Sequence, residues 1–116
     1  MNLSNPIFII SGASGAGKGT LIKGVMENHP EFQLTTSATT RPRRPSDGPN
    51  DYYFLTDEEF QKRIDDGEFV EWAQYAGNKY GTLKSELESK SKLGPVLLEI
   101  EIQGAAQIKK SGVAHT

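Results

Sequence analysis

A glycine-rich segment near the start of the chain has the residue types and spacing of a phosphate-binding loop. Its glycines let backbone N–H groups turn inward around phosphate oxygens, and a helix that starts at the loop adds its partial positive charge. A lysine at the end of the loop reaches the β- and γ-phosphates as a cation. The segment reads Gly12, Ala13, Ser14, Gly15, Ala16, Gly17, Lys18, Gly19 and Thr20. The alternative, a glycine turn with an incidental lysine, is disfavoured by six matching positions between a strand and a helix.

The position after Lys18 departs from the usual pattern, because it is Gly19 and the hydroxyl follows one residue later at Thr20. In the usual arrangement the Ser or Thr directly after the lysine contacts Mg²⁺. We therefore expect Thr20 to bind phosphate, or to reach the metal directly or through water. Glu99, which follows an apolar run, is the candidate carboxylate for the same ion. The alternative is that Glu99 and Glu101 share one strand face and point to solvent.

A second candidate anion site lies in a proline-rich loop. Residues 41–50 contain three prolines and a glycine, which excludes regular secondary structure there. Arg41 and Arg44 lie three residues apart in this loop, and forked guanidinium groups recognise phosphate oxygens. Taken alone, the segment is equally typical of a basic surface loop, a targeting signal or a nucleic-acid contact. The hydroxyls of Tyr52 and Tyr80 are candidates for the same phosphate, although either tyrosine alone is more typical of packing.

The elements that must position these residues alternate between buried strands and helices, which predicts an α/β fold with a mainly parallel sheet and helices on both faces. We expect one domain over residues 1–116, with a core of residues 1–32 and 83–116 and an inserted small β-rich subdomain of about 33–82. Thr56 to Glu59 matches a capping box. Expected strands are 7–10, 32–38, 52–55, 69–75 and 96–101; expected helices begin at 18, 56 and 83, with a short one around 105–108 and a turn at 77–79.

The composition excludes several classes of protein. The 116 residues carry 13 Lys and Arg against 15 Asp and Glu, a net charge of −2, so no bulk attraction to nucleic acid or to an anionic membrane is expected. The chain has no cysteine, which excludes disulfides and thiolate sites and fits a reducing cytoplasm. The longest apolar run, 6–10, is far shorter than a membrane span, and residues 1–4 lack the basic region of a signal peptide.

Six blocks of the sequence, taken in order, resemble the guanylate kinase family. The resemblance covers nearly the whole chain, and the agreement of six blocks is more specific than any one of them. The blocks are the phosphate loop, 37–44 (SATTRPRR), 51–54 (DYYF), 69–73 (FVEWA), 77–82 (GNKYGT) and 98–104 (LEIEIQG).

The resemblance implies a P-loop NTPase-like fold and a cytoplasmic enzyme that transfers the γ-phosphoryl of ATP to GMP with Mg²⁺. It implies Lys18, Arg41 and Arg44 as catalytic residues and the whole phosphate loop as the ATP site. Guanine presents N1–H and N2–H₂ as adjacent donors, so a carboxylate such as Glu71 accepts both, whereas adenine lacks that pair. Sites built on such hydrogen bonds reject the mismatched substrate by roughly 10⁴–10⁵. The implied GMP-binding residues are Ser37, Arg41, Arg44, Tyr52, Glu71, Tyr80, Thr82 and Glu101.

The chain also departs from the family. Members often carry Asp at the positions of Glu99 and Glu101, so both carboxylates here extend one methylene further. Arg43 has no role that the resemblance implies. The family continues into an arginine-bearing lid and an adenine-contacting loop, so this chain is either a truncated form or fragment, or a partner supplies the rest. A parallel sheet cut before its last strand exposes an unpaired edge and favours self-association.

Two other functions remain open. Guanylate-kinase-like domains of membrane-associated scaffold proteins recognise phosphorylated partners with the GMP-site arginines but lack a working phosphate loop. The intact segment from Gly12 to Lys18 argues against that alternative. The second is a kinase for another nucleoside monophosphate, because Gly-Lys-Gly-Thr also occurs in adenylate kinases; Glu71 argues for guanine.

Overall fold

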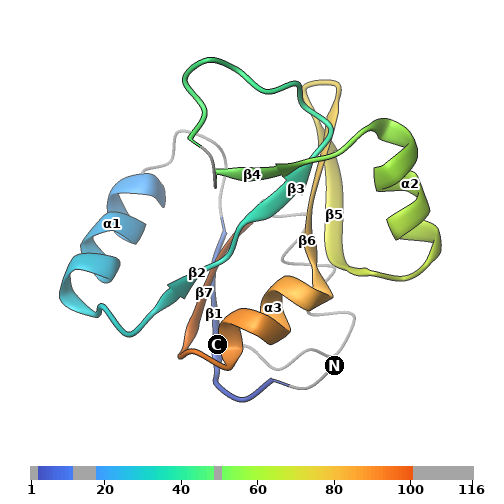
Figure 1. The fold of residues 1–116 in the computed structure, drawn as a ribbon. Coiled ribbons are helices and arrows are strands. Elements are labelled where there is room, and N and C mark those ends of the chain that lie inside the picture. The colour runs from blue at the N-terminus through green and yellow to red at the C-terminus, as the bar shows by residue number, and fades with distance from the viewer. Residues whose placement is uncertain (1–2, 12–17, 49–50, 101–116) are drawn as a thin grey trace.

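Strands and helices alternate along the chain in the computed structural model, which describes residues 3–11, 18–48 and 51–100 (Figure 1). The α/β class expected from the sequence is confirmed. In chain order the elements are β1 (Ile7–Ser11), α1 (Lys18–Asn28), β2 (Gln33–Leu34), β3 (Ser37–Thr39), β4 (Tyr52–Phe54), α2 (Asp57–Asp65), β5 (Phe69–Tyr75), β6 (Asn78–Leu83), α3 (Lys84–Ser91) and β7 (Val96–Ile100).

The first sheet is parallel and has the strand order β1-β7-β2. Its central strand is an apolar run in which Val96, Leu97 and Leu98 are buried, as expected for a strand covered on both faces. Helix α1 lies on one side of these strands and α3 on the other (Figure 1). The main apolar cluster combines residues of β1, β7, α3 and β5, namely Ile7, Val96, Leu98, Leu87 and Val70.

The second sheet has the order β4-β3-β6-β5 and is mixed, since β3 is parallel to β4 and antiparallel to β6. Helix α2 packs on one of its faces through Phe60, whose side chain is fully buried. The Phe60 ring stacks on Phe69 at a centroid distance of 4.4 Å and meets Trp72 edge-on at 6.3 Å. The register of β5 shifts between Phe69 and Glu71, so Phe69 and Trp72 lie toward α2 while Glu71 lies on the opposite face, which is left to the polar residues of the candidate site.

The chain passes from one sheet to the other at residues 35–36, and a buried carboxylate holds this crossing. Glu86 of α3 is 5 % exposed, and its Oε2 accepts a hydrogen bond from the backbone N–H of Thr36 at 2.8 Å. Its Oε1 accepts the hydroxyl of Tyr53 at 2.8 Å. The single strand expected over 32–38 is therefore wrong: it is two short strands in different sheets, because a side chain takes the amide that a continuous strand would pair.

Most other expected elements are confirmed. Thr56 and Glu59 form the capping box of α2, with the two reciprocal hydrogen bonds at 3.1 and 2.9 Å. The turn between β5 and β6 differs, because it lies at Ala76 and Gly77 rather than at 77–79. Both residues have positive φ, 51° and 81°, as in the two-residue turns that match the twist of a hairpin. An alanine with positive φ is uncommon, so the prediction from the sequence placed the start of the turn one residue too late.

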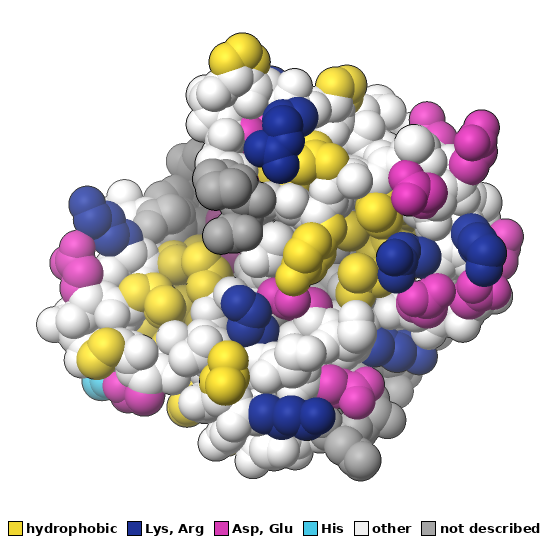
Figure 2. All heavy atoms as spheres, viewed as in Figure 1, with side chains coloured by type: hydrophobic (Ala, Val, Ile, Leu, Met, Phe, Trp, Pro, Cys, Tyr) yellow, Lys and Arg dark blue, Asp and Glu magenta, His cyan; other side chains and the backbone are white. Residues whose placement is uncertain are grey.

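The first sheet ends at Leu34 and the second begins at Ser37, close to the subdomain boundary expected at about 33. The division into core and subdomain stays a prediction, and the short helix expected around 105–108 lies outside the described residues. Within the described ranges no helix has the length and apolar character needed to cross a bilayer. On the face shown in Figure 2, Lys and Arg side chains are interspersed with Asp and Glu side chains.

Two glycine substitutions test the close approach of β5 and β6. A Cβ added at Gly81 would lie 2.8 Å from the backbone oxygen of Glu71 and 2.8 Å from the Phe69 ring. We expect Gly81→Ala to lower the free energy of unfolding by about 1–3 kcal/mol through overpacking. Gly24→Ala in α1, where a Cβ meets no described atom within 4 Å, should raise it by about 0.5–1 kcal/mol. Urea denaturation measures both, and equal effects would contradict the strand contact.

Candidate functional site

The register of the second sheet brings most of the predicted acceptor-site residues onto one face. Ser37 pairs with Tyr52, and Glu71 pairs with Thr82. Tyr80 is paired with Thr39 on one side and with Ala73 on the other. Because directly paired residues project to the same side of a sheet, Ser37, Tyr52, Glu71, Tyr80 and Thr82 share the face opposite α2. Residues 45 positions apart in sequence thus form one polar surface.

Glu71 and Thr82 are the buried polar pair of this face. Glu71 is 6 % exposed and Thr82 is fully buried. The Thr82 hydroxyl donates to Oε1 of Glu71 at 3.0 Å. Burial raises the pKa of Glu71 to about 7, and the hydrogen bond from Thr82 opposes that rise. A carboxylate with one oxygen held by a neighbour and little contact with water is suited to accept hydrogen bonds from a ligand.

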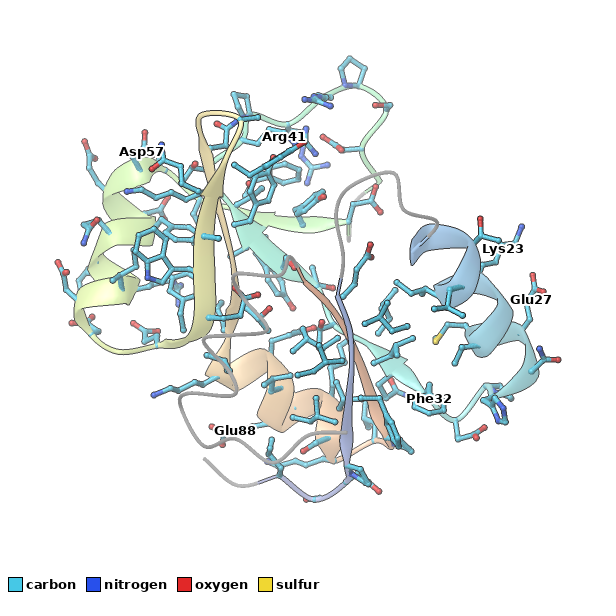
Figure 3. All side chains as sticks on the ribbon, turned by 180° about the vertical axis from the view of Figure 1, so that it is seen from behind. Lys23, Glu27, Phe32, Arg41, Asp57 and Glu88 are labelled. Atoms are coloured by element: carbon cyan, nitrogen blue, oxygen red, sulfur yellow. The ribbon has the colours of Figure 1, made fainter. Side chains whose placement is uncertain are left out.

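Arg41 extends the polar face at the far end of β3. Its guanidinium carbon lies 5.1 Å from the centroid of the Tyr52 ring and 5.7 Å from that of Phe54, beside the aromatic side chains of the second sheet (Figure 3). The Tyr52 and Tyr80 rings meet edge-on at 6.1 Å. A guanidinium and two phenols therefore lie together, which is the donor set expected for a phosphate.

An acidic residue that the sequence analysis did not single out holds Arg41. Both carboxylate oxygens of Asp47 accept from Arg41, Oδ1 from Nη2 at 2.9 Å and Oδ2 from Nη1 at 3.1 Å. This contact raises the pKa of Arg41 and, together with the backbone N–H of Arg44, lowers the pKa of Asp47. Arg41 and Asp47 lie six residues apart in an irregular loop, where no helix or strand period predicts which side chains meet. The ion pair is therefore evident only in the folded structure.

The other two arginines of the loop are exposed. The Arg43 guanidinium lies 4.5 Å from the Phe54 ring centroid and donates to the backbone oxygen of Gly48 at 3.3 Å. The N–H of Arg44 donates to Asp47 Oδ2 at 2.6 Å, which fixes the backbone of Arg44 close to Arg41. The described part of the loop, 40–48, has no helix or strand, as expected.

The phosphate loop from Gly12 to Gly17 and the carboxylate of Glu101 lie outside the described residues. Strand β1 ends directly before the loop at Ser11, and α1 begins directly after it at Lys18. Thr20, in the first turn of α1, is exposed.

Glu99 is an exposed residue near the carboxyl end of β7. It is paired with Ile10, one residue before the end of β1. This register places Glu99 beside the strand that leads into the glycine-rich segment. In the described ranges no group of three or more His, Cys, Asp or Glu residues is arranged to hold a metal ion by itself.

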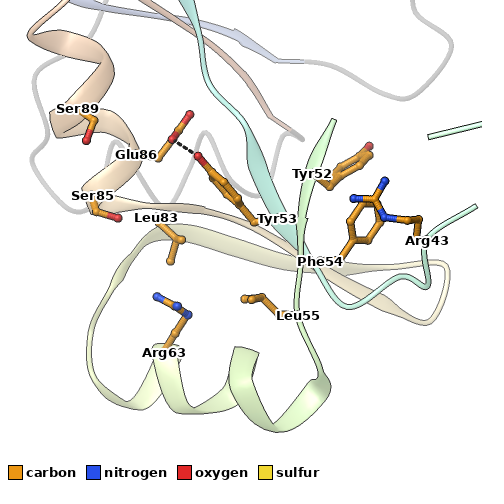
Figure 4. A pocket seen from close by; sticks show the side chains of 10 residues that line it. All are labelled: Arg43, Tyr52, Tyr53, Phe54, Leu55, Arg63, Leu83, Ser85, Glu86 and Ser89. Carbon is orange, nitrogen blue, oxygen red and sulfur yellow. Dashed lines mark hydrogen bonds between the residues drawn. The ribbon is translucent and has the colours of Figure 1, made fainter. Parts of the chain in front are cut away.

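A cavity of about 560 Å³ lies between β4, α2 and α3 (Figure 4). Of the predicted site residues it contains only Tyr52, and Glu71 and Thr82 do not line it. The Tyr53–Glu86 hydrogen bond crosses one side of it (Figure 4), and that bond raises the pKa of Tyr53. The cavity is thus separate from the Glu71 pair.

The described residues define an α/β protein whose second sheet, of four strands, carries a polar face with an arginine at its end. Residues 4–115 match the family model of guanylate kinase. The chain belongs to the guanylate kinase family.

Relatives and a solved structure agree with this assignment. The chain is 50 % identical over 108 residues to a guanylate kinase of Synechococcus elongatus, an alignment that covers 90 % of this chain and 58 % of that protein. It is 47 % identical over 111 residues to a guanylate kinase of Thermotoga maritima, covering 93 % and 53 %. The crystal structure of guanylate kinase from Anaplasma phagocytophilum superposes with a TM-score of 0.69 at 28 % identity, over 95 % of this chain and 55 % of that one. The chain therefore spans little more than half the length of these relatives.

The buried Glu71 carboxyl should make stability depend on pH. Its pKa is about 7 in the folded chain against an ordinary value of 4.5, so between these values the folded state binds a proton that the unfolded state does not. We expect the free energy of unfolding to fall by about 2 kcal/mol between about pH 5 and pH 7.5, relative to Glu71→Gln. Urea denaturation across this range measures the effect. Parallel pH profiles of the two proteins would contradict the raised pKa.

Proposed function

We propose that this chain provides the nucleotide sites of a guanylate kinase, which transfers the γ-phosphoryl group of ATP to GMP and yields ADP and GDP. The observation that carries the proposal is the common face of Glu71, Thr82, Tyr52 and Tyr80 with Arg41 at its end. Family membership and relatives named guanylate kinase support it. The subdomain of about 33–82 takes the acceptor, and the core of 1–32 and 83–116 takes the donor.

Glu71 is the residue that selects the base. Its carboxylate accepts the N1–H and N2–H₂ donors of guanine. The hydroxyl of Ser37 is the donor for O6, because Thr82 already donates its single hydroxyl proton to Oε1 of Glu71. Since Glu71 is only 6 % exposed, a base without these donors leaves a buried charge unpaired, which is strongly unfavourable. Glu101 is proposed as a further guanine contact.

The acceptor phosphate is held by Arg41, Arg44, Tyr52 and Tyr80. Arg41 and the two phenols lie close together, and Arg44 is exposed in the same loop. Two guanidinium groups supply forked hydrogen bonds and neutralise the charge that the acceptor brings toward a polyanionic donor. This arrangement holds the acceptor oxygen in place for in-line attack, and positioning of that kind accounts for much of the catalysis of phosphoryl transfer.

The donor triphosphate is held by the loop 12–17, by Lys18 and by the start of α1. The strand–segment–helix order observed from β1 to α1 is that of a phosphate-binding loop. The oxygens of Thr20 and Glu99 fit Mg²⁺, which prefers oxygen ligands and keeps few protein contacts beside the phosphates. Mg²⁺, when bound, neutralises charge on the β- and γ-phosphates.

Removing the loop lysine tests the donor site. Lys18→Ala should lower the turnover of the full chain 10²-fold or more (~3 kcal/mol), because the lysine cation that neutralises the transferring phosphoryl group is lost. GMP binding should stay unchanged. Lys23→Ala, an exposed lysine on the same helix (Figure 3), is the control. ADP formation with GMP, AMP, CMP and UMP is the measurement. Activity with AMP alone would refute the guanine assignment, and undiminished activity of Lys18→Ala would refute the donor site.

Removing the charge of Glu71 tests base recognition. Glu71→Gln should weaken GMP binding roughly 10–100-fold, because hydrogen bonds to a charged group are lost. The wild-type chain should bind GMP more tightly than IMP, whose base lacks the N2 amino group, and the variant should lose most of this difference. Isothermal titration calorimetry measures both ligands. Glu68→Gln, the same change at a half-exposed carboxylate paired with Arg63, should leave both affinities unchanged.

A further inference from the structure

Among the described residues, Asp47 is the only acidic residue whose side chain binds the guanidinium of one predicted phosphate-site arginine, Arg41, and the backbone N–H of a second, Arg44. It accepts two hydrogen bonds from the Arg41 guanidinium and one from the N–H of Arg44. Its own N–H donates to the backbone oxygen of Arg44 at 3.0 Å. The side chains of Arg41 and Asp47 are each 9 % exposed. Asp47 is therefore built into the loop rather than resting on its surface.

The geometry of the ion pair leaves part of Arg41 for a ligand. A guanidinium has five N–H donors in one plane. Asp47 takes one from each terminal nitrogen, and the backbone oxygen of Pro42 takes another from Nη1 at 3.2 Å. In the described part of the chain, no hydrogen bond of Arg41 uses Nε. Among the described residues, the edge formed by Nε–H and the second Nη2–H therefore has no hydrogen-bond partner, and such an edge fits a phosphate bidentately.

We propose that Asp47 is a positioning residue for the acceptor phosphate: it fixes Arg41 so that its Nε and Nη2 edge faces the phosphate, and holds Arg44 at the same site. This inference rests on the proposed function. A free arginine loses much side-chain entropy when it binds a ligand, whereas one already held by Asp47 and by the Tyr52 ring loses little.

The opposite role, in which Asp47 competes with the phosphate for Arg41, makes the opposite prediction. Several features disfavour it. The loop from 41 to 48 contains three arginines and one acid, so it stays cationic with the ion pair in place. Displacing Asp47 would break its bond to the Arg44 N–H as well as the pair with Arg41. A charge-assisted pair with so little exposure is unfavourable to break by removing one partner.

The test compares GMP with guanosine, which lacks the phosphate, by calorimetric titration of the full chain. Asp47→Asn should weaken GMP binding about tenfold, the order expected when a ligand must order a long side chain, and leave guanosine binding unchanged. In the background of Arg41→Lys, where the forked pair is already lost, Asp47→Asn should have little further effect. Asp51→Asn is the matched control, because Asp51 caps the N–H of Gly48 in the same loop without touching Arg41.

Each outcome decides the role of Asp47. Unchanged or tighter GMP binding by Asp47→Asn overturns the positioning role and leaves the proposed function intact. If Asp47→Asn weakens the binding of GMP and of guanosine equally, Asp47 has a merely structural role and the positioning role is overturned. The positioning role is also overturned if the losses of GMP affinity from Arg41→Lys and Asp47→Asn add up in the double variant. If the wild-type chain binds neither ligand, the proposed function fails and the inference fails with it.

Discussion

The register between β5 and β6 is the constraint on which the candidate site depends. It sets Glu71 opposite Thr82 and Ala73 opposite Tyr80, and a slip of one residue would turn all of these side chains toward α2. The stacked Phe60 and Phe69 rings on the other face oppose such a slip, because it would move apolar side chains into water. Apolar packing on one face therefore determines polar geometry on the other.

The two candidate anion sites are organised in different ways. The proposed donor site is the segment between β1 and α1, and a loop that precedes a helix typically offers backbone N–H groups to a phosphate. The acceptor site depends on side chains from β4, β6 and an irregular loop, and its arginine is held by a carboxylate and by aromatic rings. Under the proposed function, specificity for the base and affinity for the phosphate would come from separate groups on and beside the four-stranded sheet.

The sequence predicted the α/β class, the capping box at Thr56 and most strand positions, because each has a local signal in residue type or period. It also proposed Glu71 and Thr82, but through a family resemblance, since nothing local pairs two residues 11 apart. It missed Asp47 and Glu86. Both are charged residues whose burial follows from tertiary contacts, and an acidic residue in a loop or helix is otherwise most often solvated.

The pKa of Glu71 near neutrality has a consequence for ligand occupancy. Near neutral pH both the protonated and the ionised form of this carboxyl are populated in the free protein, because burial raises its pKa into that range. A base that offers two donors engages the ionised form only, so its binding would expel that proton into the buffer. For the proposed ligand, binding of the base and protonation of the Glu71 carboxyl are then linked equilibria. Binding lowers the affinity of the carboxyl for a proton, and protonation lowers its affinity for the base.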